Sequence, residues 1–300
     1  MNKTTHKIKR SAFAAILAVA LLAAAPAQAD ELLGGYTRPT AANTGPLPGT
    51  VFVGATTNAI TTPYATIQNT AFTGQVTVAA SHVTFRNCRF NGNMNNYAIS
   101  ITPGITATTI DRCDIRNASS ALVLGDNFRL TQSYLHDTYA DAIKAGSNSI
   151  IQSNFIRHIG QAPADIDVHG DAIQISGGTN ITVQGNHIYV PINECNHSNS
   201  ALQIEPQVNV GNIDGVLIRY NWLAGGNYAI IAANKVDKDG NVLRTVKNIQ
   251  IIANRFKPGK GTIYRSGIWA CKPGTFSARR SNQWDVSPTY PPIPDDYNNQ

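Results

Sequence analysis

Short runs of alternating apolar and polar residues recur along most of the chain, and each run ends in the same way. Alternating apolar positions are followed by Cys, Ser or Asn, then any residue, then another apolar residue. Period-two alternation is typical of β-strands with one buried face. Seven segments share this pattern: 83–90, 108–115, 128–135, 149–156, 181–188, 216–223 and 249–256.

The polar position of this repeat forms a column with regular spacing. Its steps are 25, 20, 21, 32, 35 and 33 residues, through Cys88, Cys113, Ser133, Asn154, Asn186, Asn221 and Asn254. Steps near 20 fit a bare coil of a solenoid, whereas steps above 30 imply insertions that project as loops. Asn can hydrogen-bond along such a column and tolerates the left-handed backbone of a sharp corner, so we expect a structural role for it.

A second short strand follows each copy of the repeat. Its alternation predicts an inward face made of Ile99/Ile101, Leu122/Leu124, Ile143/Ala145, Ile173/Ile175, Leu202/Ile204, Ile230/Ala232 and Ile268/Ala270. A coil of about 20 residues cannot bury this face alone, and stacked coils can. The sequence therefore predicts an all-β fold, a right-handed parallel β-helix of about 7–9 coils over residues 51–276.

The two ends of the chain differ from the repeat. Residues 1–29 combine a basic start, an apolar run and the pattern Ala27-Gln28-Ala29, which predicts a cleaved signal peptide and a secreted or periplasmic protein. We expect residues 30–50 to lead into or cap the first coil. The Pro-rich residues 277–300 are expected to form a C-terminal tail.

The signal peptide also changes the charge balance. The whole chain has 24 Lys+Arg against 18 Asp+Glu, and four of the basic residues lie within 1–29, which leaves 20 against 18. This balance, without a dense basic patch, argues against a nucleic-acid partner. No second apolar run reaches the length of a membrane span. We therefore expect a protein that binds neither nucleic acid nor membranes. We also expect it to be a monomer.

Four cysteines in an exported chain allow two disulfides. Cys88 and Cys113 share one inward column, where the strand spacing of about 4.8 Å exceeds the Cβ–Cβ distance of about 3.8 Å in a disulfide. Stacked free thiols and a bond are both compatible with that position. Cys195 and Cys271 fall in later loops and make the better candidate pair.

The outward face of the second strand is where the fold does not dictate the residue. A column of small residues is expected there as the floor of a groove, unless a neighbouring loop packs on it: Ala98, Ala121, Ala142, Ala172, Ala201, Ala229 and Gly267. Beside it runs a column that is polar in the central coils: Ser100, Val123, Lys144, Gln174, Gln203, Ile231 and Trp269.

Titratable residues gather around these central coils. The insertion 157–174 holds His158, Asp165, Asp167, His169 and Asp171, and one coil earlier stand His136, Asp137, Asp141 and Lys144. Long loops beside a rigid scaffold are where sites tend to be built. We expect these side chains to converge with Gln174, Gln203 and Glu205 on the middle of one face.

The coil pattern of residues 50–275, with the segment His169-Gly170-Asp171-Ala172-Ile173-Gln174, resembles the pectate-lyase-like superfamily of right-handed parallel β-helix proteins. That superfamily includes polysaccharide lyases, hydrolases, uronate epimerases, phage tailspikes and inactive adhesins. The resemblance therefore implies carbohydrate more strongly than it implies a reaction. The Asp-Pro-His motif of alginate epimerases is absent, because Val168 stands where Pro is expected, and so are the motifs of polygalacturonases.

We hypothesise a polysaccharide lyase that cleaves a uronate-containing, acidic polymer by β-elimination. Lys144 or His169 could be the base. A Ca²⁺ ion held by Asp141, Asp171 and Glu205 could neutralise the substrate carboxylate. The residues expected to bind the substrate are His136, His158, Gln174, Gln203, Glu205 and Trp269.

Two alternatives stay open. A glycoside hydrolase could use Asp141 and Asp171 as its carboxylate pair, because adjacent coils place their Cα atoms about 4.8 Å apart, and a uronate epimerase could occupy the same face. A non-catalytic glycan-binding or structural β-helix would explain the alanine column and the glutamines without chemistry. Trp222 and Trp269 could then stack on sugar rings, or they could pack against a loop or the C-terminal tail.

Overall fold

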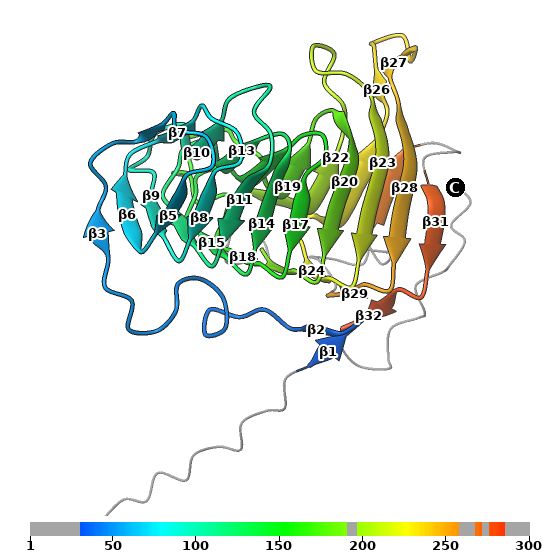
Figure 1. The fold of residues 1–300 in the computed structure, drawn as a ribbon. Coiled ribbons are helices and arrows are strands. Elements are labelled where there is room, and N and C mark those ends of the chain that lie inside the picture. The colour runs from blue at the N-terminus through cyan, green and yellow to red at the C-terminus, as the bar shows by residue number, and fades with distance from the viewer. Residues whose placement is uncertain (1–30, 191–196, 258–267, 272–275, 286–300) are drawn as a thin grey trace, which may run out of the picture. The chain divides into compact units, whose positions relative to one another are not determined.

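The computed structural model describes residues 31–190, 197–257, 268–271 and 276–285. In this part the chain winds through three parallel sheets, and successive coils add one strand to each sheet (Figure 1). The predicted right-handed parallel β-helix is confirmed. The described residues form strands and no helix, so no helix among them is long and apolar enough to cross a membrane. The predicted signal peptide lies outside the described residues.

The three sheets, here called I, II and III, follow one another in every coil. Sheet I has nine strands: β4 (Ala59–Ile60), β7 (Val76–Val78), β10 (Tyr97–Ile101), β13 (Ala121–Gly125), β16 (Asp141–Ala145), β19 (Gly170–Ile175), β22 (Ser198–Ile204), β25 (Tyr228–Ala233) and β30 (Ile268–Cys271). Sheet II also has nine: β5 (Thr66–Gln68), β8 (Thr84–Arg86), β11 (Thr108–Asp111), β14 (Phe128–Thr131), β17 (Ile150–Gln152), β20 (Gly178–Gln184), β23 (Ile213–Arg219), β28 (Val246–Ile252) and β31 (Phe276–Arg280).

Sheet III completes each coil and has ten strands: β3 (Val53–Gly54), β6 (Thr70–Thr73), β9 (Arg89–Asn91), β12 (Asp114–Arg116), β15 (Tyr134–His136), β18 (Phe155–Arg157), β21 (His187–Tyr189), β24 (Trp222–Ala224), β29 (Arg255–Phe256) and β32 (Gln283–Trp284). Two antiparallel pairs stand apart from the coils. They are β1 (Leu32–Leu33) with β2 (Tyr36–Thr37), and β26 (Lys235–Val236) with β27 (Val242–Arg244).

The core lies between the three sheets, where the inward side chains of stacked strands meet. Ile143 pairs with Ile173, which pairs with Leu202, and all three are fully buried. Each such aliphatic side chain stabilises the fold by roughly 1.5–3 kcal/mol relative to exposure. At the first coils the core is aromatic, with Phe72 stacked on Phe90 at 4.9 Å.

The polar column marks the corner between sheets II and III and forms a buried ladder. The main-chain N–H and side-chain amide of Asn154 both donate to Oδ1 of Asn186, at 2.9 and 3.0 Å. The same two bonds recur through Asn186, Asn221, Asn254 and Asn282. The structural role predicted for the column is confirmed, and Asn282 extends it beyond the seven predicted members.

The left-handed backbone at this corner lies one residue before the ladder, not on it. The residues with positive φ, between 47° and 63°, are Asn87, Arg112, Gln132, Ser153, Gly185, Tyr220, Ala253 and Ser281. The ladder asparagines are therefore held by hydrogen bonding rather than by a conformational preference. The expectation that these asparagines adopt the left-handed backbone of the corner is therefore wrong.

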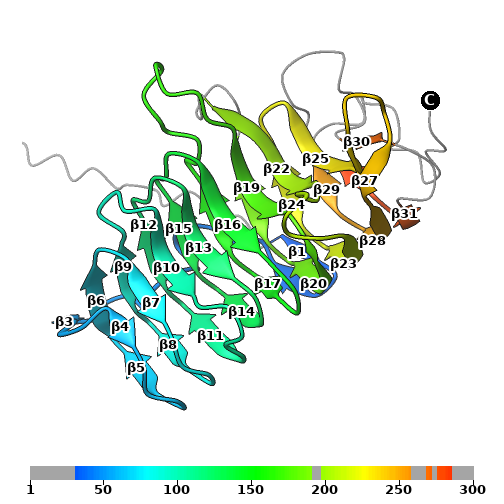
Figure 2. The same ribbon diagram turned by 90° about the horizontal axis from the view of Figure 1, so that it is seen from above.

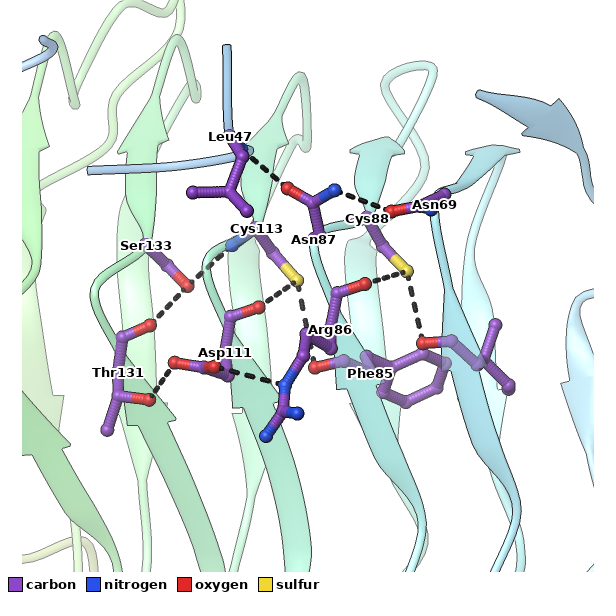
Figure 3. Close-up of polar contacts among 11 residues, drawn as sticks. Leu47, Asn69, Phe85, Arg86, Asn87, Cys88, Asp111, Cys113, Thr131 and Ser133 are labelled. Atoms are coloured by element: carbon purple, nitrogen blue, oxygen red, sulfur yellow. Dashed lines mark hydrogen bonds and ion pairs between the residues drawn. The ribbon is translucent and has the colours of Figure 1, made fainter. Parts of the chain in front are cut away.

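The ladder begins with two thiols instead of amides (Figure 3). Cys88 and Cys113 are buried and free. The Sγ of Cys88 donates to the carbonyl oxygen of Arg86 at 3.3 Å, and the Sγ of Cys113 donates to that of Asp111 at 3.3 Å. The N–H of Cys113 donates to Ser133 Oγ at 3.0 Å, which connects the thiols to the ladder. The hydrogen bond from Cys113 lowers the pKa of Cys88, whereas burial raises that of Cys113.

Residues 31–50 form a strap rather than a cap on the first coil. Figure 1 shows this blue segment running beneath the coils from β32 back to β3. Arg38 bonds Asp285 of the last described coil at 2.9 Å, and the N–H of Leu47 donates to Asn87 near the first coils. Between these ends the strap lies over stacked rings of sheet III, where Phe155 is 4.9 Å from His187.

The insertions and the C-terminal boundary follow from the register. The long steps of the repeat correspond to the connection between β18 and β19, to residues 205–212 after β22, and to the hairpin β26–β27 (Figures 1 and 2). Strands β31 and β32 continue sheets II and III. The solenoid therefore extends through Trp284, beyond the predicted boundary at residue 276.

Candidate functional site

The candidate site lies on the outer face of sheet I. Strand register aligns one outward side chain from each coil into a single column: Ser100, Leu124, Lys144, Gln174, Gln203 and Ile231. The predicted member from β13 was Val123, which is wrong, because Val123 pairs with Ile143 and is fully buried. Leu124 therefore points outward, and so does Leu122, which stands level with Ala142, so the predicted inward place of Leu122 and Leu124 is also wrong.

This column borders a groove of about 580 Å³. The groove runs across the strands from Tyr97 in β10 to Gln207 and Val210 after β22. Its further lining residues come from the ends of the sheet I strands and the turns that follow them: Ser100, Ile101, Pro103, Leu124, Gly125, Asp126, Lys144, Ala145, Gly146, Ser147, Gln174, Ser176, Gly177 and Gly178. The groove thus crosses five coils.

Lys144 lines the groove, and its ammonium group is held by Asp141 and Ser120. Its Nζ is 3.3 Å from Oδ2 of Asp141 and donates to Ser120 Oγ at 3.2 Å. The side chain of Asp141 is almost fully buried, whereas that of Lys144 is 30 % exposed. One face of the ammonium group is therefore held by the protein, and the other is available to a ligand.

Asp171 is the fully buried neighbour of Asp141 in the next coil. Its Oδ1 accepts hydrogen bonds from Ser200 Oγ at 2.5 Å and from the Asn199 amide at 3.2 Å, while its Oδ2 has no partner. Burial raises the pKa of Asp171 to about 7, against the bond from Ser200, and the nearby Asp141 adds to the rise. Burial also raises the pKa of Asp141, although Lys144 opposes it.

Three polar side chains extend the line of Lys144 along the solenoid. The Gln174 amide donates to Gln203 at 3.1 Å, and the Gln203 amide donates to Glu205 at 3.3 Å. Glu205 also pairs with Lys235 of the hairpin β26–β27 at 3.1 Å. The register of Lys144 with Gln174, together with these contacts, places the predicted residues Lys144, Gln174, Gln203 and Glu205 on one face.

The alanine column is not an open floor. The six members within the described part are buried, five of them completely: Ala98, Ala121, Ala142, Ala172, Ala201 and Ala229. A Cβ atom at Gly92 would lie only 3.2 Å from the Cβ of Ala98, so the turn entering sheet I packs directly on this column. The prediction that these alanines form the groove floor is wrong. At Ala98 the neighbouring turn leaves no room for a larger side chain. In β13 the register places Leu122 in this column instead of Ala121, because Ala121 pairs with Asp141.

Two of the predicted histidines, His136 and His158, do not join Lys144. His136 ends β15 on sheet III, where its ring lies between Asp137 at 2.6 Å and Asp114 at 3.2 Å. Burial disfavours its charge, but the bonds to both carboxylates outweigh burial and raise the pKa of His136. His158 lies 3.4 Å from the same Asp137. These two histidines therefore form a separate cluster on a different sheet.

The remaining predicted residues lie on the connection before β19 and in strands β24 and β30. His169, Asp165 and Asp167 are exposed on the connection that leads into β19. Trp222 is buried and lies beneath Arg38 of the strap, so of the two alternatives for it the structure supports packing against another segment, not stacking on sugar. The backbone of Trp269 pairs with that of Ile231, but its side chain and the Cys195–Cys271 pair lie outside the described residues.

The three predicted calcium ligands do not form a metal centre. One oxygen of Asp141 faces Lys144 and the other accepts from the Asp171 N–H, while Glu205 is engaged by Gln203 and Lys235. No group of three His, Cys, Asp or Glu among the described residues could hold an ion. The arrangement of these three residues therefore does not fit a Ca²⁺ ion.

Several lining residues were not predicted. Asp126 lies in the turn after β13, where its Oδ1 accepts from the Ser147 N–H at 2.7 Å. Tyr97 begins β10 and also lines the groove. Ser120, which precedes β13, contacts Lys144 without lining the groove. A correct alignment of β13 with β16 would have placed Asp126 beside Gly146, since Gly125 pairs with Ala145. No other pattern in the sequence points to these residues.

Comparison with known proteins yields the fold and little more. No protein-family model matches the chain, and no curated protein matches it. Among solved structures, a mutant tailspike protein of E. coli bacteriophage HK620 in complex with a pentasaccharide is similar, with a TM-score of 0.51 and 14% identity over 75% of this chain. The A-module of the mannuronan C-5 epimerase AlgE6 from Azotobacter vinelandii gives a TM-score of 0.36 and 15% identity, over 80% of this chain and 79% of the module.

The match to the tailspike covers 43% of that protein, so the chain spans less than half the length of this neighbour. At such low identity the likeness concerns the backbone path alone. The chain therefore shares the parallel β-helix fold of the tailspike.

Proposed function

We propose that this protein binds a polysaccharide along the groove of sheet I and cleaves it, by β-elimination at a uronate. The observation that carries the proposal is the position of Lys144, an ammonium group fixed by a buried carboxylate and open to the groove on its other side. The pentasaccharide in the tailspike complex supports a glycan as the ligand of this fold. A secreted or periplasmic location is part of the same proposal.

The dimensions of the groove favour an oligomeric ligand. It crosses five coils, and four inter-strand spacings of about 4.8 Å give a length of about 19 Å. A monosaccharide would fill only a fraction of this length. A polymer lying parallel to the solenoid axis would contact the outward side chain of each coil in turn.

β-Elimination needs a cation at the uronate carboxylate and a base at C5. The base removes the C5 proton, the C4–oxygen bond breaks, a C4–C5 double bond forms and the leaving oxygen takes up a proton. Lys144 suits the first role because it can neutralise the carboxylate and so acidify C5. The candidate base is His169, which is exposed on the connection before β19. It does not line the groove, so it would have to approach a bound sugar from the side where β19 begins.

Hydrolysis by Asp141 and Asp171 is less well supported. A carboxyl group that protonates a glycosidic oxygen must reach it. Asp141 is 3% exposed and Asp171 is not exposed at all. Their contacts with Lys144, Ser200 and the next strand give them a positioning role instead.

A purely binding protein is the second candidate. It is favoured by the continuous amide line of Gln174 and Gln203, which offers hydrogen bonds to sugar hydroxyls and no acid or base. In this case Lys144 would select an acidic sugar without activating it.

Incubation of the purified protein with acidic and neutral polysaccharides tests the proposal. Ultraviolet absorbance of unsaturated uronate ends and a reducing-end assay are followed together, with His169→Ala as the variant. Elimination predicts that both signals rise together and that the variant abolishes them. Reducing ends without absorbance would replace elimination by hydrolysis. Binding without either signal would leave the second candidate.

A further inference from the structure

The groove carries very few charges for a site that faces an acidic polymer. Of its described lining residues, only Lys144 and Asp126 are charged. Asp126 is partly exposed, and its Oδ1 is fixed by the Ser147 N–H. The rest of the lining consists of amide, hydroxyl, glycine and apolar groups.

The single cation is also partly neutralised. Asp141 lies 3.3 Å from Lys144 Nζ, beneath the groove. One ammonium and two carboxylates therefore act on a ligand in this region. A polymer with a carboxylate on every sugar would place one of them at Lys144 and the next ones beside Asp126 or the glutamine amides. A substrate carboxylate a few ångströms from the Asp126 carboxylate would be repelled by about 1 kcal/mol or more at a protein surface.

The uncharged lining suits neutral sugars. Gln174 and Gln203 present amides that can bond hydroxyl groups. The lining also contains four apolar residues, Ile101, Pro103, Leu124 and Val210, here called the apolar wall, which can contact the C–H face of a sugar or acyl and methyl substituents. Neither the amides nor the apolar residues carry a positive charge that would neutralise a substrate carboxylate.

Resting on the proposed function, we infer that the ligand is a heteropolysaccharide in which one acidic sugar lies among neutral sugars. The acidic sugar is the one that reaches Lys144. Its neighbours lie over the amides, the apolar wall and the region of Asp126. A uronate homopolymer is the wrong ligand for this groove.

Oligosaccharides of matched length separate these possibilities. Fragments of deacylated gellan carry one glucuronate in each tetrasaccharide repeat, alginate fragments carry a uronate at every position, and dextran fragments carry none. Binding is measured by calorimetry at about 20 mM and about 200 mM NaCl, since screening reports the number of ionic contacts. We expect gellan to bind at least about tenfold more tightly than alginate or dextran, with only a few-fold loss at the higher salt.

Two variants locate the effect. Asp126→Asn keeps the acceptor for Ser147 but removes the charge, so it should raise the affinity for alginate severalfold. Lys144→Gln should reduce gellan binding to the level of dextran. Lys247→Gln, an exposed cation on sheet II, is the matched control and should change neither.

The outcomes distinguish the two levels of the proposal. Alginate binding as tight as gellan binding, with a steep salt dependence, would overturn the inference and leave the proposed function intact. An affinity for alginate that does not change in Asp126→Asn would also count against it. Failure to bind any of the three glycans would overturn the proposed function together with the inference.

Discussion

The main-chain N–H of Asp171 donates a hydrogen bond of 2.8 Å to Oδ1 of Asp141, one coil earlier. The other oxygen of Asp141 lies 3.3 Å from Lys144. A single buried carboxylate therefore aligns the start of β19 and holds the cation of the groove. The site and the stacking of the coils are connected through this one side chain.

Asp171→Asn should make the protein more stable at neutral pH. The folded-state pKa of Asp171 is raised to about 7, above the value of 3.8 for an unperturbed group. The folded protein therefore retains a proton that the unfolded chain loses, so this group's contribution to stability is complete below about pH 4 and is lost as the pH rises to about 7. The Asn side chain keeps the acceptor for Ser200 and Asn199, so the variant should gain a few kcal/mol at pH 8.

Thermal unfolding between pH 4 and pH 8 measures this difference. The variant should lack the decline of the melting temperature that the parent shows over this interval. Asp165→Asn, on an exposed loop, is the control and should follow the parent. A variant whose melting temperature falls with pH as steeply as that of the parent would refute the assignment.

Replacing Lys144 should lower the free energy of unfolding, because it leaves the buried carboxylate of Asp141 without a cationic partner. Lys144→Gln leaves the buried Asp141 charge without its partner and should destabilise the protein by about 1–3 kcal/mol. Asp141→Asn in the same chain removes that charge and should recover most of the loss. A double-mutant cycle from urea unfolding gives the coupling between the two residues. Strictly additive effects would show that the pair is not coupled.

The ladder should be sensitive to loss of a single amide. Asn186→Ala removes the acceptor for the buried N–H and side-chain amide of Asn154, so we expect a loss of about 2–4 kcal/mol in the free energy of unfolding. Gln184→Ala, in the same coil, breaks bonds to Gln152 and Arg219 on the partly exposed face of sheet II. It should cost less than about 1 kcal/mol. Similar losses in both variants would contradict the special role of the buried ladder.

Arg38 should control the protonation of His187. The histidine accepts from Arg38 through Nε2 at 3.2 Å and donates through Nδ1 to the Pro39 carbonyl oxygen at 2.8 Å, an arrangement of the neutral ring. Burial, and then the charge of Arg38, lowers the pKa of His187 to about 4. Its contribution to stability is therefore present above pH 6.5 and lost as the pH falls towards 4.

Arg38→Ala should raise the pKa of His187 towards its ordinary value and release the strap. Histidine resonances followed by NMR give the pKa, and hydrogen exchange of residues 31–50 reports the release. An unchanged pKa, or unchanged protection of the strap, would show that Arg38 does not hold this segment.

The sequence predicted the coils well because stacked strands impose a strict period. The column from Cys88 to Asn254 and the positions of the insertions were found from spacing alone. The error at β13 has a simple cause. Its segment Ala121 to Leu124 is apolar throughout, so alternation could not decide which side chains face inward, and a slip of one residue exchanges the two faces.

The site was harder to predict because chain proximity does not fix the sheet. His136 and Asp141 are five residues apart, yet the corner between them moves His136 to sheet III and Asp141 to sheet I. The strap was missed for a different reason. Residues 31–50 carry no repeat, so only tertiary contacts such as those of Arg38 and Leu47 determine where they lie.

The strap has a consequence for how the protein is made. Arg38 and Asp285 are 247 residues apart, yet they are joined by an ion pair of 2.9 Å. Residues 31–50 are therefore synthesised before the coil of Asp285 and cannot reach their binding place until that coil has formed. Coils can be added one by one, but this contact forms only after the last described coil is in place. A chain truncated before Asp285 would keep its early coils and lack the ion pair that holds the strap to the last described coil.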